Sequence, residues 1–230
     1  MTQIWAHRGA STAAPENTLA AFDVAVRQGA QGVELDVQRS ADGVVVVIHD
    51  ETVDRTTRGT GRVVDLAADE LRAWGVPTLA EVLDLLAPTD LRVNVELKNG
   101  VEPYPGLEED VEAVVTGSRL AEDAPERVVY SSFNHRSLAR LDELGTRVPL
   151  GVLHVEAMVR PWVYAASFGA RALHPMALTV LPEEVAQAHE AGMAVHVWTV
   201  DDPDAVRTLA AAGVNAIITN VPDVALAALG

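Results

Sequence analysis

The sequence predicts an α/β protein, a closed (β/α)8 barrel with a small insertion after the second strand. Short apolar runs rich in β-branched residues alternate with amphipathic helical patterns, and about eight such units fit into 230 residues. An open doubly wound sheet is the alternative, but no glycine-rich phosphate-binding loop follows the first strand. We therefore expect one barrel domain that spans residues 1–230.

The predicted strands are almost continuously apolar, as expected for strands that are covered on both faces of a parallel sheet. They comprise residues 3–7, 32–37, 92–97, 127–132, 148–153, 170–173, 194–199 and 216–220. Most are followed by a helix whose start is marked by a capping residue or a proline. These starts are Asn17, Pro77 with Thr78, Asn134, Pro182, and Asp202 with Pro203. Residues 154–170 carry the weakest pattern, and a helix is predicted to begin there at Pro161.

One stretch, residues 41–66, interrupts the alternation of strands and helices. It predicts a turn at Asp42 and Gly43, an additional strand at 44–48 and then a polar excursion. Because this stretch follows the second strand, it lies at the carboxyl-terminal mouth of the predicted barrel, where functional groups usually gather.

Charge and composition exclude several classes of partner. The formal net charge is −16, and nucleic acids and anionic membranes both require a basic surface, so neither partner is expected. No apolar run approaches the ~20 residues that a membrane crossing needs, and the N-terminus lacks the pattern of a signal peptide. The chain has no cysteine, which excludes disulfides and fits a reducing compartment. We therefore expect a cytoplasmic protein without stable membrane association.

Acidic side chains at the ends of neighbouring strands predict a metal site. Glu34 and Asp36 are two residues apart, so both side chains leave the same face of their strand, and Glu96 and Lys98 share a face in the next parallel strand. Converging carboxylates are costly to bury unless a cation joins them. Three oxygen donors suit Mg²⁺ or Ca²⁺ better than zinc. For each acid taken alone, pairing with an arginine or exposure to solvent is the alternative.

Two histidines accompany these acids in the predicted barrel. His7 ends the first strand and His49 ends the additional strand. Histidine exchanges protons near neutral pH, so the pair predicts an acid and a base on opposite sides of a reacting bond, although either alone could be a core residue. Arg8 and Lys98, the only lysine, add positive charge nearby. Cations, a divalent ion and two histidines together predict a site for a phosphate ester.

Four further side chains are candidates for the walls of this site. His154 and His174 follow the fifth and sixth predicted strands, at the expected mouth, where a binding role and a packing role are both open. Trp198 lies near the end of the seventh predicted strand and Phe133 follows the fourth. Either aromatic ring can form an apolar wall of the pocket or pack in the core.

An ordered set of motifs along nearly the whole chain resembles the glycerophosphodiester phosphodiesterase family. The motifs run from residue 4 to about residue 223, and they are HRG, PENT, GVELDV, DGVVVVIHD, DRTTRGTG, VPTLAEVL, VELK, SSF, VWTV and GVNAIITNVP. The resemblance implies a TIM-type barrel that hydrolyses deacylated phospholipids, such as glycerophosphocholine or glycerophosphoethanolamine, to glycerol 3-phosphate and an alcohol. The residues of about 51–77 look like the small cap region of bacterial members.

The resemblance also implies roles for the residues described above. The implied ligands of the divalent ion are Glu34, Asp36 and Glu96. The implied acid–base pair is His7 and His49, with His49 the expected acid and His7 the expected base. The implied substrate contacts are Arg8 and Lys98 on the phosphate, and Trp198 and Phe133 on the glycerol or head-group side.

The chain departs from the family pattern at two places. Residues 39–43 read RSADG where the family commonly has Thr-x-Asp-Gly, and Asn220 stands where aspartate is frequent. Neither departure touches the implied metal ligands or histidines, so both bear on substrate preference more than on activity. The sequence leaves open which of the two histidines is the acid, and whether water or a substrate hydroxyl attacks first. It also leaves open the head group, the choice between Mg²⁺ and Ca²⁺, and the oligomeric state.

Two other functions are compatible with the same barrel. One is the lipid-cleaving phospholipase D branch, which acts on lysolipids or sphingomyelin and usually has a leader and disulfides; the absence of cysteine argues against it. The other is a barrel that binds metal or phosphate without turnover. Such a protein has no need of two histidines and three carboxylates, yet all five are present.

Overall fold

The computed structural model describes residues 1–230, and its centre is a closed barrel of parallel strands. The barrel strands are β1 (Gln3–His7), β2 (Gly32–Arg39), β4 (Arg92–Leu97), β5 (Val128–Ser132), β6 (Leu150–His154), β7 (Ala172–Pro175), β8 (Ala194–Val197) and β9 (Ala216–Thr219). Each of them pairs with the next, and β1 pairs with both β2 and β9, which closes the ring. The predicted (β/α)8 barrel is confirmed.

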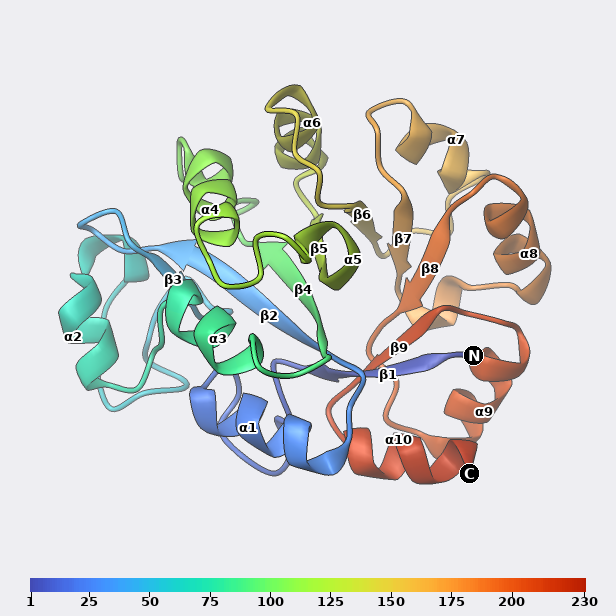
Figure 1. Cartoon of the computed structure of the whole chain (residues 1–230), viewed down its shortest axis with the longest axis horizontal. Coiled ribbons are helices and arrows are strands. Elements are labelled where there is room, and N and C mark those ends of the chain that lie inside the picture. Colours follow the sequence, from blue (N-terminus) through green and yellow to red (C-terminus); the bar gives the residue numbers. More distant parts are fainter.

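Helices surround the barrel and alternate with its strands (Figure 1). They are α1 (Leu19–Gln28), α2 (Ala68–Ala73), α3 (Leu79–Leu86), α4 (Leu107–Thr116), α5 (Ala124–Arg127), α6 (His135–Glu143), α7 (Pro161–Ala166), α8 (Pro182–Glu190), α9 (Pro203–Ala211) and α10 (Pro222–Leu229), with short 3-10 turns η1 (Val63–Asp65) and η2 (Ala177–Thr179). The apolar sides of the helices cover the strands from outside, so the strands are buried on both faces; every residue of β2 except Arg39 is buried.

Local sequence determines where most elements begin. The hydroxyl of Thr78 accepts a hydrogen bond from the backbone N–H of Glu81, whose carboxylate bonds back to Thr78, so a capping box starts α3 as predicted. In α1 the cap is Thr18 and not Asn17, because the Asn17 side chain is committed to Asp36 in the barrel. Pro149 has no N–H to donate to the sheet, and β6 begins one residue later, two residues after the predicted start.

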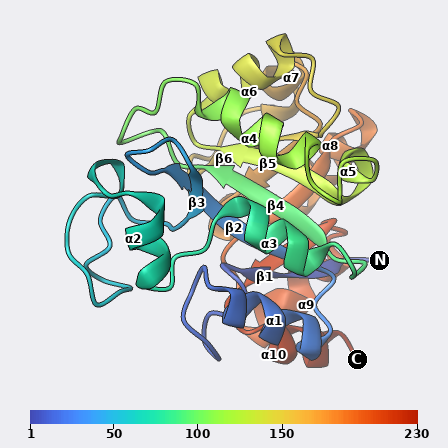
Figure 2. The ribbon, with the colours of Figure 1, turned by 60° about the vertical axis from the view of Figure 1, so that its left-hand side comes forward.

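The insertion after β2 builds a small unit beside the barrel. Strand β3 (Val45–Val47) pairs antiparallel with β2 on the outside of the ring. Figure 2 shows α2 and its flanking loops projecting from this side. The unit has an apolar cluster separate from the main core, made of Val46, Ile48, Val53, Val63, Leu71 and Val76. That residues 51–77 act as a cap stays a prediction.

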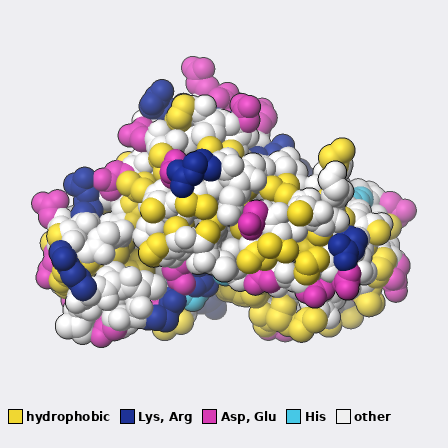
Figure 3. Space-filling view, turned by 90° about the horizontal axis from the view of Figure 1, so that it is seen from below, with side chains coloured by type: hydrophobic (Ala, Val, Ile, Leu, Met, Phe, Trp, Pro, Cys, Tyr) yellow, Lys and Arg dark blue, Asp and Glu magenta, His cyan; other side chains and the backbone are white.

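The surface carries charges of both signs. On the face shown in Figure 3, basic side chains are interspersed with acidic ones and form no continuous patch. None of the helices combines the length and the apolar character that a membrane crossing requires.

Candidate active site

The carboxyl ends of the parallel strands meet at one mouth of the barrel, and a cavity of about 120 Å³ opens there. Eight of the residues singled out in the sequence line this cavity: His7, Arg8, Glu34, His49, Glu96, Lys98, Phe133 and Trp198. Asn94, Leu153, Thr199 and Ile218 complete its wall. The structure therefore brings together segments that are separated by nearly the whole length of the chain.

Glu34, Asp36 and Glu96 form a cluster at the floor of the cavity. The parallel register places Asp36 beside Glu96, and each of the three side chains offers one oxygen atom within 4.8 Å of the other two. All three are at most 9% exposed. Oε1 of Glu34 is buried and has no hydrogen-bond partner in the protein. An unpartnered buried carboxylate oxygen within a set of oxygen donors fits a hard divalent cation such as Mg²⁺ or Ca²⁺.

The protein alone does not neutralise this cluster. Burial, followed by repulsion from the neighbouring carboxylates, raises the pKa of Glu34 well above its ordinary value. The same two causes raise the pKa of Glu96 to about 7, against the opposing effect of Lys98. These shifts indicate that too little positive charge lies near Glu34 and Glu96, and an added divalent cation would relieve their repulsion.

Two cations contact the cluster from the side of the cavity. Nζ of Lys98 lies 2.9 Å from Oε1 of Glu96 and 3.8 Å from Oδ1 of Asp36. Nε of Arg8 lies 3.3 Å from Oδ2 of Asp36. Arg8 adopts a left-handed backbone conformation, with φ of 56°, and its own N–H donates to Oε2 of Glu34 at 2.9 Å. The turn is completed by Gly9, where a Cβ atom would lie 2.7 Å from Ala21.

His7 is held in one tautomer by Asn220. Nδ1 of His7 lies 2.7 Å from Oδ1 of Asn220, while Nδ2 of Asn220 donates to the Asp201 carboxylate at 2.7 Å. Because the carboxylate needs a donor, the amide oxygen must face His7, so Nδ1 carries the proton. Nε2 then points to the acidic cluster, 3.9 Å from Oε2 of Glu34. Burial, with help from Arg8, lowers the pKa of His7 and favours the neutral ring.

His49 is held in the same tautomer by a different group. Nδ1 of His49 lies 2.7 Å from Oδ1 of Asp50, a carboxylate that can only accept the hydrogen bond when it is ionised. Hydrogen bonds from Arg55 and from His49 hold the pKa of Asp50 far below its usual range. The amide nitrogen of Gln38, which is fully buried, donates to the backbone carbonyls of Ile48, His49 and Asp50. Both the ring and its backbone are therefore fixed.

A chain of ion pairs joins the insertion to the metal cluster. Nε of Arg55 donates to Asp50 at 2.6 Å, and its Nη atoms donate to both oxygens of Glu16 at 2.7 and 2.9 Å. Glu16 also accepts from Arg8 at 2.9 Å, and the two arginines lower its pKa to about 2. Arg8 in turn pairs with Asp36. Asp50 and Arg55 of the insertion are thus connected to Asp36 of the metal cluster through Glu16 and Arg8, with acidic and basic side chains in alternation.

The opposite wall of the cavity is apolar. The rings of Phe133 and Trp198 meet edge to face, with centroids 5.5 Å apart and an interplanar angle of 87°. The indole N–H of Trp198 donates to the backbone oxygen of His174 at 2.7 Å, which fixes the ring. Phe133 is 44% exposed, so its face is available to a ligand.

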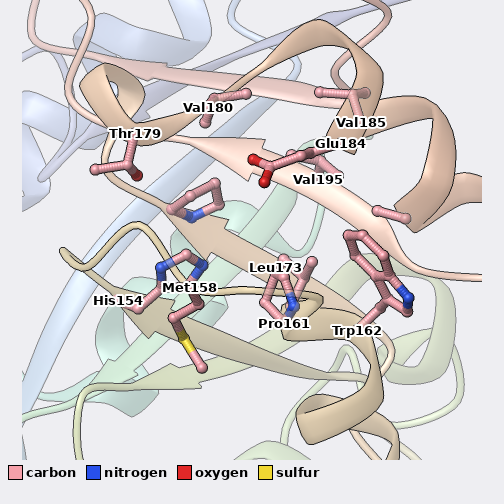
Figure 4. Close-up of a pocket in the computed structure, with 12 residues that line it drawn as sticks. His154, Met158, Pro161, Trp162, Leu173, Thr179, Val180, Glu184, Val185 and Val195 are labelled. Carbon is pink, nitrogen blue, oxygen red and sulfur yellow. The ribbon is translucent and has the colours of Figure 1, made fainter.

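The two histidines with open roles, His154 and His174, lie outside this cavity. His174 is fully buried inside the barrel, where its Nε2 lies 2.9 Å from Nδ1 of His196. His154 points away from the barrel interior into a pocket near α7 and α8 (Figure 4). Neither side chain is in position to contact a ligand between His7 and His49.

Sequence reasoning did not identify the groups that orient the histidines, namely Gln38, Asp50, Arg55, Asp201 and Glu16. Asp50 follows His49 directly in the sequence, so a histidine–carboxylate dipeptide was the available signal. Asn220 was noted only as a departure from the common family residue, yet it orients His7. The remaining partners come from distant segments and carry no local pattern.

Comparison with known proteins places the chain among phosphodiesterases. The model of the "Glycerophosphoryl diester phosphodiesterase family" matches residues 7–224. A glycerophosphodiester phosphodiesterase of Caldanaerobacter subterraneus subsp. tengcongensis is 40% identical over 235 residues, covering 96% of this chain and 95% of the relative. A glycerophosphodiester phosphodiesterase of Bacillus altitudinis is 36% identical, covering 97% of this chain and 96% of the relative.

A solved structure shows the same architecture. The Oleispira antarctica phosphodiesterase, determined in complex with the product sn-glycerol-3-phosphate, superposes with a TM-score of 0.87 at 28% identity and covers 100% of this chain and 97% of its own. Together with the family match over most of the chain, these findings settle its relationship. The chain belongs to the glycerophosphoryl diester phosphodiesterase family of enzymes.

Proposed function

We propose that this enzyme hydrolyses glycerophosphodiesters, such as glycerophosphocholine or glycerophosphoethanolamine, to glycerol 3-phosphate and an alcohol, with a divalent metal ion and two histidines as acid and base. One observation carries the proposal: two imidazoles with fixed tautomers and two cations line one cavity together with Glu34 and Glu96, which form a buried carboxylate cluster with Asp36. The relatives named for this activity, and the product complex of the Oleispira enzyme, support the choice of substrate.

The metal ligands in this proposal are Glu34, Asp36 and Glu96, whose oxygens already lie within 4.8 Å of one another. Bound there, Mg²⁺ or Ca²⁺ would polarise a phosphate oxygen and make the attacking hydroxyl more acidic. Lys98 and Arg8 border both the cluster and the cavity, so they would bind the remaining phosphate oxygens. Phe133 and Trp198 would contact the carbon atoms of the glycerol or the head group.

The different hydrogen-bond partners of the two histidines support different roles for them in this proposal. His7 meets a neutral amide at Nδ1, and burial lowers its pKa, so its Nε2 is poised to accept a proton from the attacking hydroxyl of water or of the substrate glycerol. Nδ1 of His49 is hydrogen-bonded to the Asp50 carboxylate, which orients the ring, and we assign His49 as the acid. That ring donates its Nε2 proton to the leaving alkoxide. His7 is therefore the base and His49 the acid, and the P–O bond to the alcohol breaks as the new P–O bond forms. Attack by water gives glycerol 3-phosphate directly, whereas attack by the glycerol hydroxyl gives a cyclic phosphodiester, in which water must then break one ring P–O bond to give glycerol 3-phosphate.

The experiment is an assay of glycerol 3-phosphate release from glycerophosphocholine, with saturating Mg²⁺ or Ca²⁺ and with chelator. We expect chelator to abolish turnover and either ion to restore it. The variant His49→Ala should lose roughly 10²–10⁴-fold in kcat while its metal affinity stays unchanged. His189→Gln, on the exposed face of α8, is the matched control and should keep wild-type turnover. Full activity in chelator would contradict the metal assignment, and near-normal turnover of His49→Ala would remove His49 from the chemistry.

The same assay tests the lipid-cleaving alternative. Lysophosphatidylcholine and sphingomyelin carry acyl chains that need an apolar groove next to the site, whereas the apolar wall here consists mainly of two aromatic rings and two aliphatic side chains. We expect neither lipid to be hydrolysed at a rate comparable with glycerophosphocholine. A preference for either lipid would contradict the proposed substrate class.

A further inference from the structure

A second pocket lies outside the barrel, between the end of β6, helix α7 and helix α8 (Figure 4). We call it the α7–α8 pocket. Its lining residues are His154, Met158, Pro161, Trp162, Leu173, Pro175, Thr179, Val180, Glu184, Val185, Ala188 and Val195. Its enclosed part has a volume of about 30 Å³, which gives room for about two or three non-hydrogen atoms, and a further atom of a ligand would extend to the open rim. Side chains on α7 and α8 at its rim are only half-buried, so solvent can reach it.

His154 presents an unsatisfied hydrogen-bond acceptor to this pocket. The residue is 5% exposed, and its Nδ1 lies 2.9 Å from the backbone oxygen of Glu156. A carbonyl oxygen only accepts, so Nδ1 carries the proton and Nε2 carries a lone pair. Nε2 is buried and has no partner in the protein. Burial also lowers the pKa of His154, which keeps the ring neutral and Nε2 an acceptor.

The other polar side chains of the pocket are acceptors as well. The Glu184 carboxylate extends over the pocket in Figure 4 and makes no hydrogen bond or ion pair in the structure. Glu184 and His154 both line this pocket. The hydroxyl proton of Thr179 is donated to the backbone oxygen of Met176 at 2.8 Å, so its oxygen can only accept from the pocket. In Figure 4 the indole nitrogen of Trp162 lies on the far side of its ring.

A ligand that satisfies these groups must donate hydrogen bonds and carry positive charge. An N–H group can bond to Nε2 of His154 and to the Glu184 carboxylate, and an ammonium group also gains from the negative charge of Glu184. The walls are otherwise apolar, with Met158, Trp162 and Leu173 available to the carbon atoms of the ligand.

We propose that the α7–α8 pocket binds a small primary ammonium compound, with its nitrogen between His154 and Glu184 and its carbon atoms against Met158 and Trp162. Ethanolamine, which hydrolysis of glycerophosphoethanolamine would release, belongs to this chemical class. That connection alone rests on the proposed function, whereas binding of the ammonium group does not depend on any catalytic residue.

The test uses the full chain labelled with ¹³C at its methionine methyl groups, and ethylammonium chloride as the ligand. The chain has four methionines, and Met158 is the one that lines the pocket, so its signal, identified with Met158→Leu, reports binding at this place. We expect a saturable shift of the Met158 signal with ethylammonium and with ethanolamine. Ethanol, which has a similar shape without the charge, should bind at least about tenfold more weakly. Tetramethylammonium, which has no N–H, should not shift the signal.

Two variants remove the two proposed acceptors one at a time. Glu184→Gln keeps the shape of the side chain and removes its charge, and His154→Asn keeps the bond to the Glu156 carbonyl while it removes Nε2. Each should weaken ethylammonium binding at least about tenfold. Glu183→Gln, the exposed neighbour on α8, should bind ethylammonium like the wild type. Unchanged affinity in Glu184→Gln, or equal binding of ethanol, would overturn the proposal even if the enzyme proved fully active on glycerophosphodiesters.

Discussion

Replacement of Asp50 by asparagine tests the assignment of His49 as the acid. Asp50 accepts a hydrogen bond from Nδ1 of His49 at 2.7 Å and from Nε and Nη2 of Arg55 at 2.6 and 3.1 Å. An asparagine has only one oxygen for these donors. Since the guanidinium always carries its protons, the amide oxygen should turn to Arg55 and the amide NH2 to His49. The imidazole of His49 then has no acceptor for a proton at Nδ1, so it adopts the other tautomer.

The size of the effect follows from burial. In the buried triad of serine proteases, the corresponding change lowers kcat by about 10⁴. The side chains of His49 and Asp50 are 32% and 27% exposed, so solvent screens much of their interaction. A charge-assisted bond in this setting contributes about 1.5–2 kcal/mol, which corresponds to a loss in kcat of roughly 10–30-fold. The change should leave KM and metal affinity nearly unaltered, because Asp50 contacts neither the carboxylate cluster nor the cavity.

The assay measures glycerol 3-phosphate release from glycerophosphocholine over a range of substrate concentrations at saturating metal. Asp65→Asn is the matched control, since Asp65 lies in the same insertion, is 66% exposed and makes only a 4.0 Å ion pair with Arg62. We expect wild-type kinetics for the control. A kcat for Asp50→Asn within about twofold of the wild type would refute the proposed role of the carboxylate and, with it, the structural basis for His49 as the acid.

Three further predictions address the metal cluster, the insertion and the barrel interior. Glu34→Gln removes one of three carboxylates that repel one another, so calorimetry should show a higher Tm for the metal-free variant than for the metal-free wild type. Addition of Mg²⁺ or Ca²⁺ should not raise the Tm of the variant further. A rise in Tm on metal addition as large as that of the wild type would exclude Glu34 as a ligand. Arg55→Gln breaks the link from Asp50 to Glu16, and proteolysis should cut residues 51–77 faster than in the wild type, while equal rates would contradict the link. Burial lowers the pKa of His196 to about 3, whereas its ordinary value is 6.5, so the unfolded chain takes up this proton first as the pH falls. The contribution of neutral His196 to stability is therefore complete above pH ~6.5 and is lost towards pH ~3. Between these pH values, the unfolding free energy of the wild type should fall more steeply with falling pH than that of His196→Gln, by up to about 1.4 kcal/mol per pH unit. Parallel curves for the two proteins would contradict this prediction.

The sequence was sufficient for the barrel and for the metal cluster because both depend on local periodicity. Strands covered on both faces are continuously apolar, and this pattern marked each barrel strand to within about two residues. Alternation along a strand placed Glu34 and Asp36 on one face, and the parallel register then brought Glu96 beside Asp36. These inferences needed the direction of a side chain and the order of strands, but no knowledge of distant partners.

Small errors at strand ends had larger consequences for the other histidines. The sixth predicted strand ended at residue 173, which left His174 at the mouth, whereas β7 extends to Pro175 and encloses His174 within the barrel. For His154 the decisive fact is which of two adjacent residues faces inward. Leu153 lines the catalytic cavity, so His154 must face the helices. From the sequence alone, either Leu153 or His154 can face the barrel interior, and only the register of β6 with its neighbours decides between them.

The difference between the surroundings of His7 and His49 depends on Asn220, a residue whose role the sequence does not indicate. The first strand ends in a histidine and the insertion ends a strand in another, so local sequence makes His7 and His49 equivalent. They differ in their hydrogen-bond partners. Nδ1 of His7 is bonded to the amide of Asn220, from the last strand–helix junction, and Nδ1 of His49 is bonded to the carboxylate of Asp50, from the insertion. Under the proposed mechanism, the neutral amide of Asn220 leaves Nε2 of His7 free to accept a proton, while the Asp50 carboxylate orients the ring of His49 as the acid.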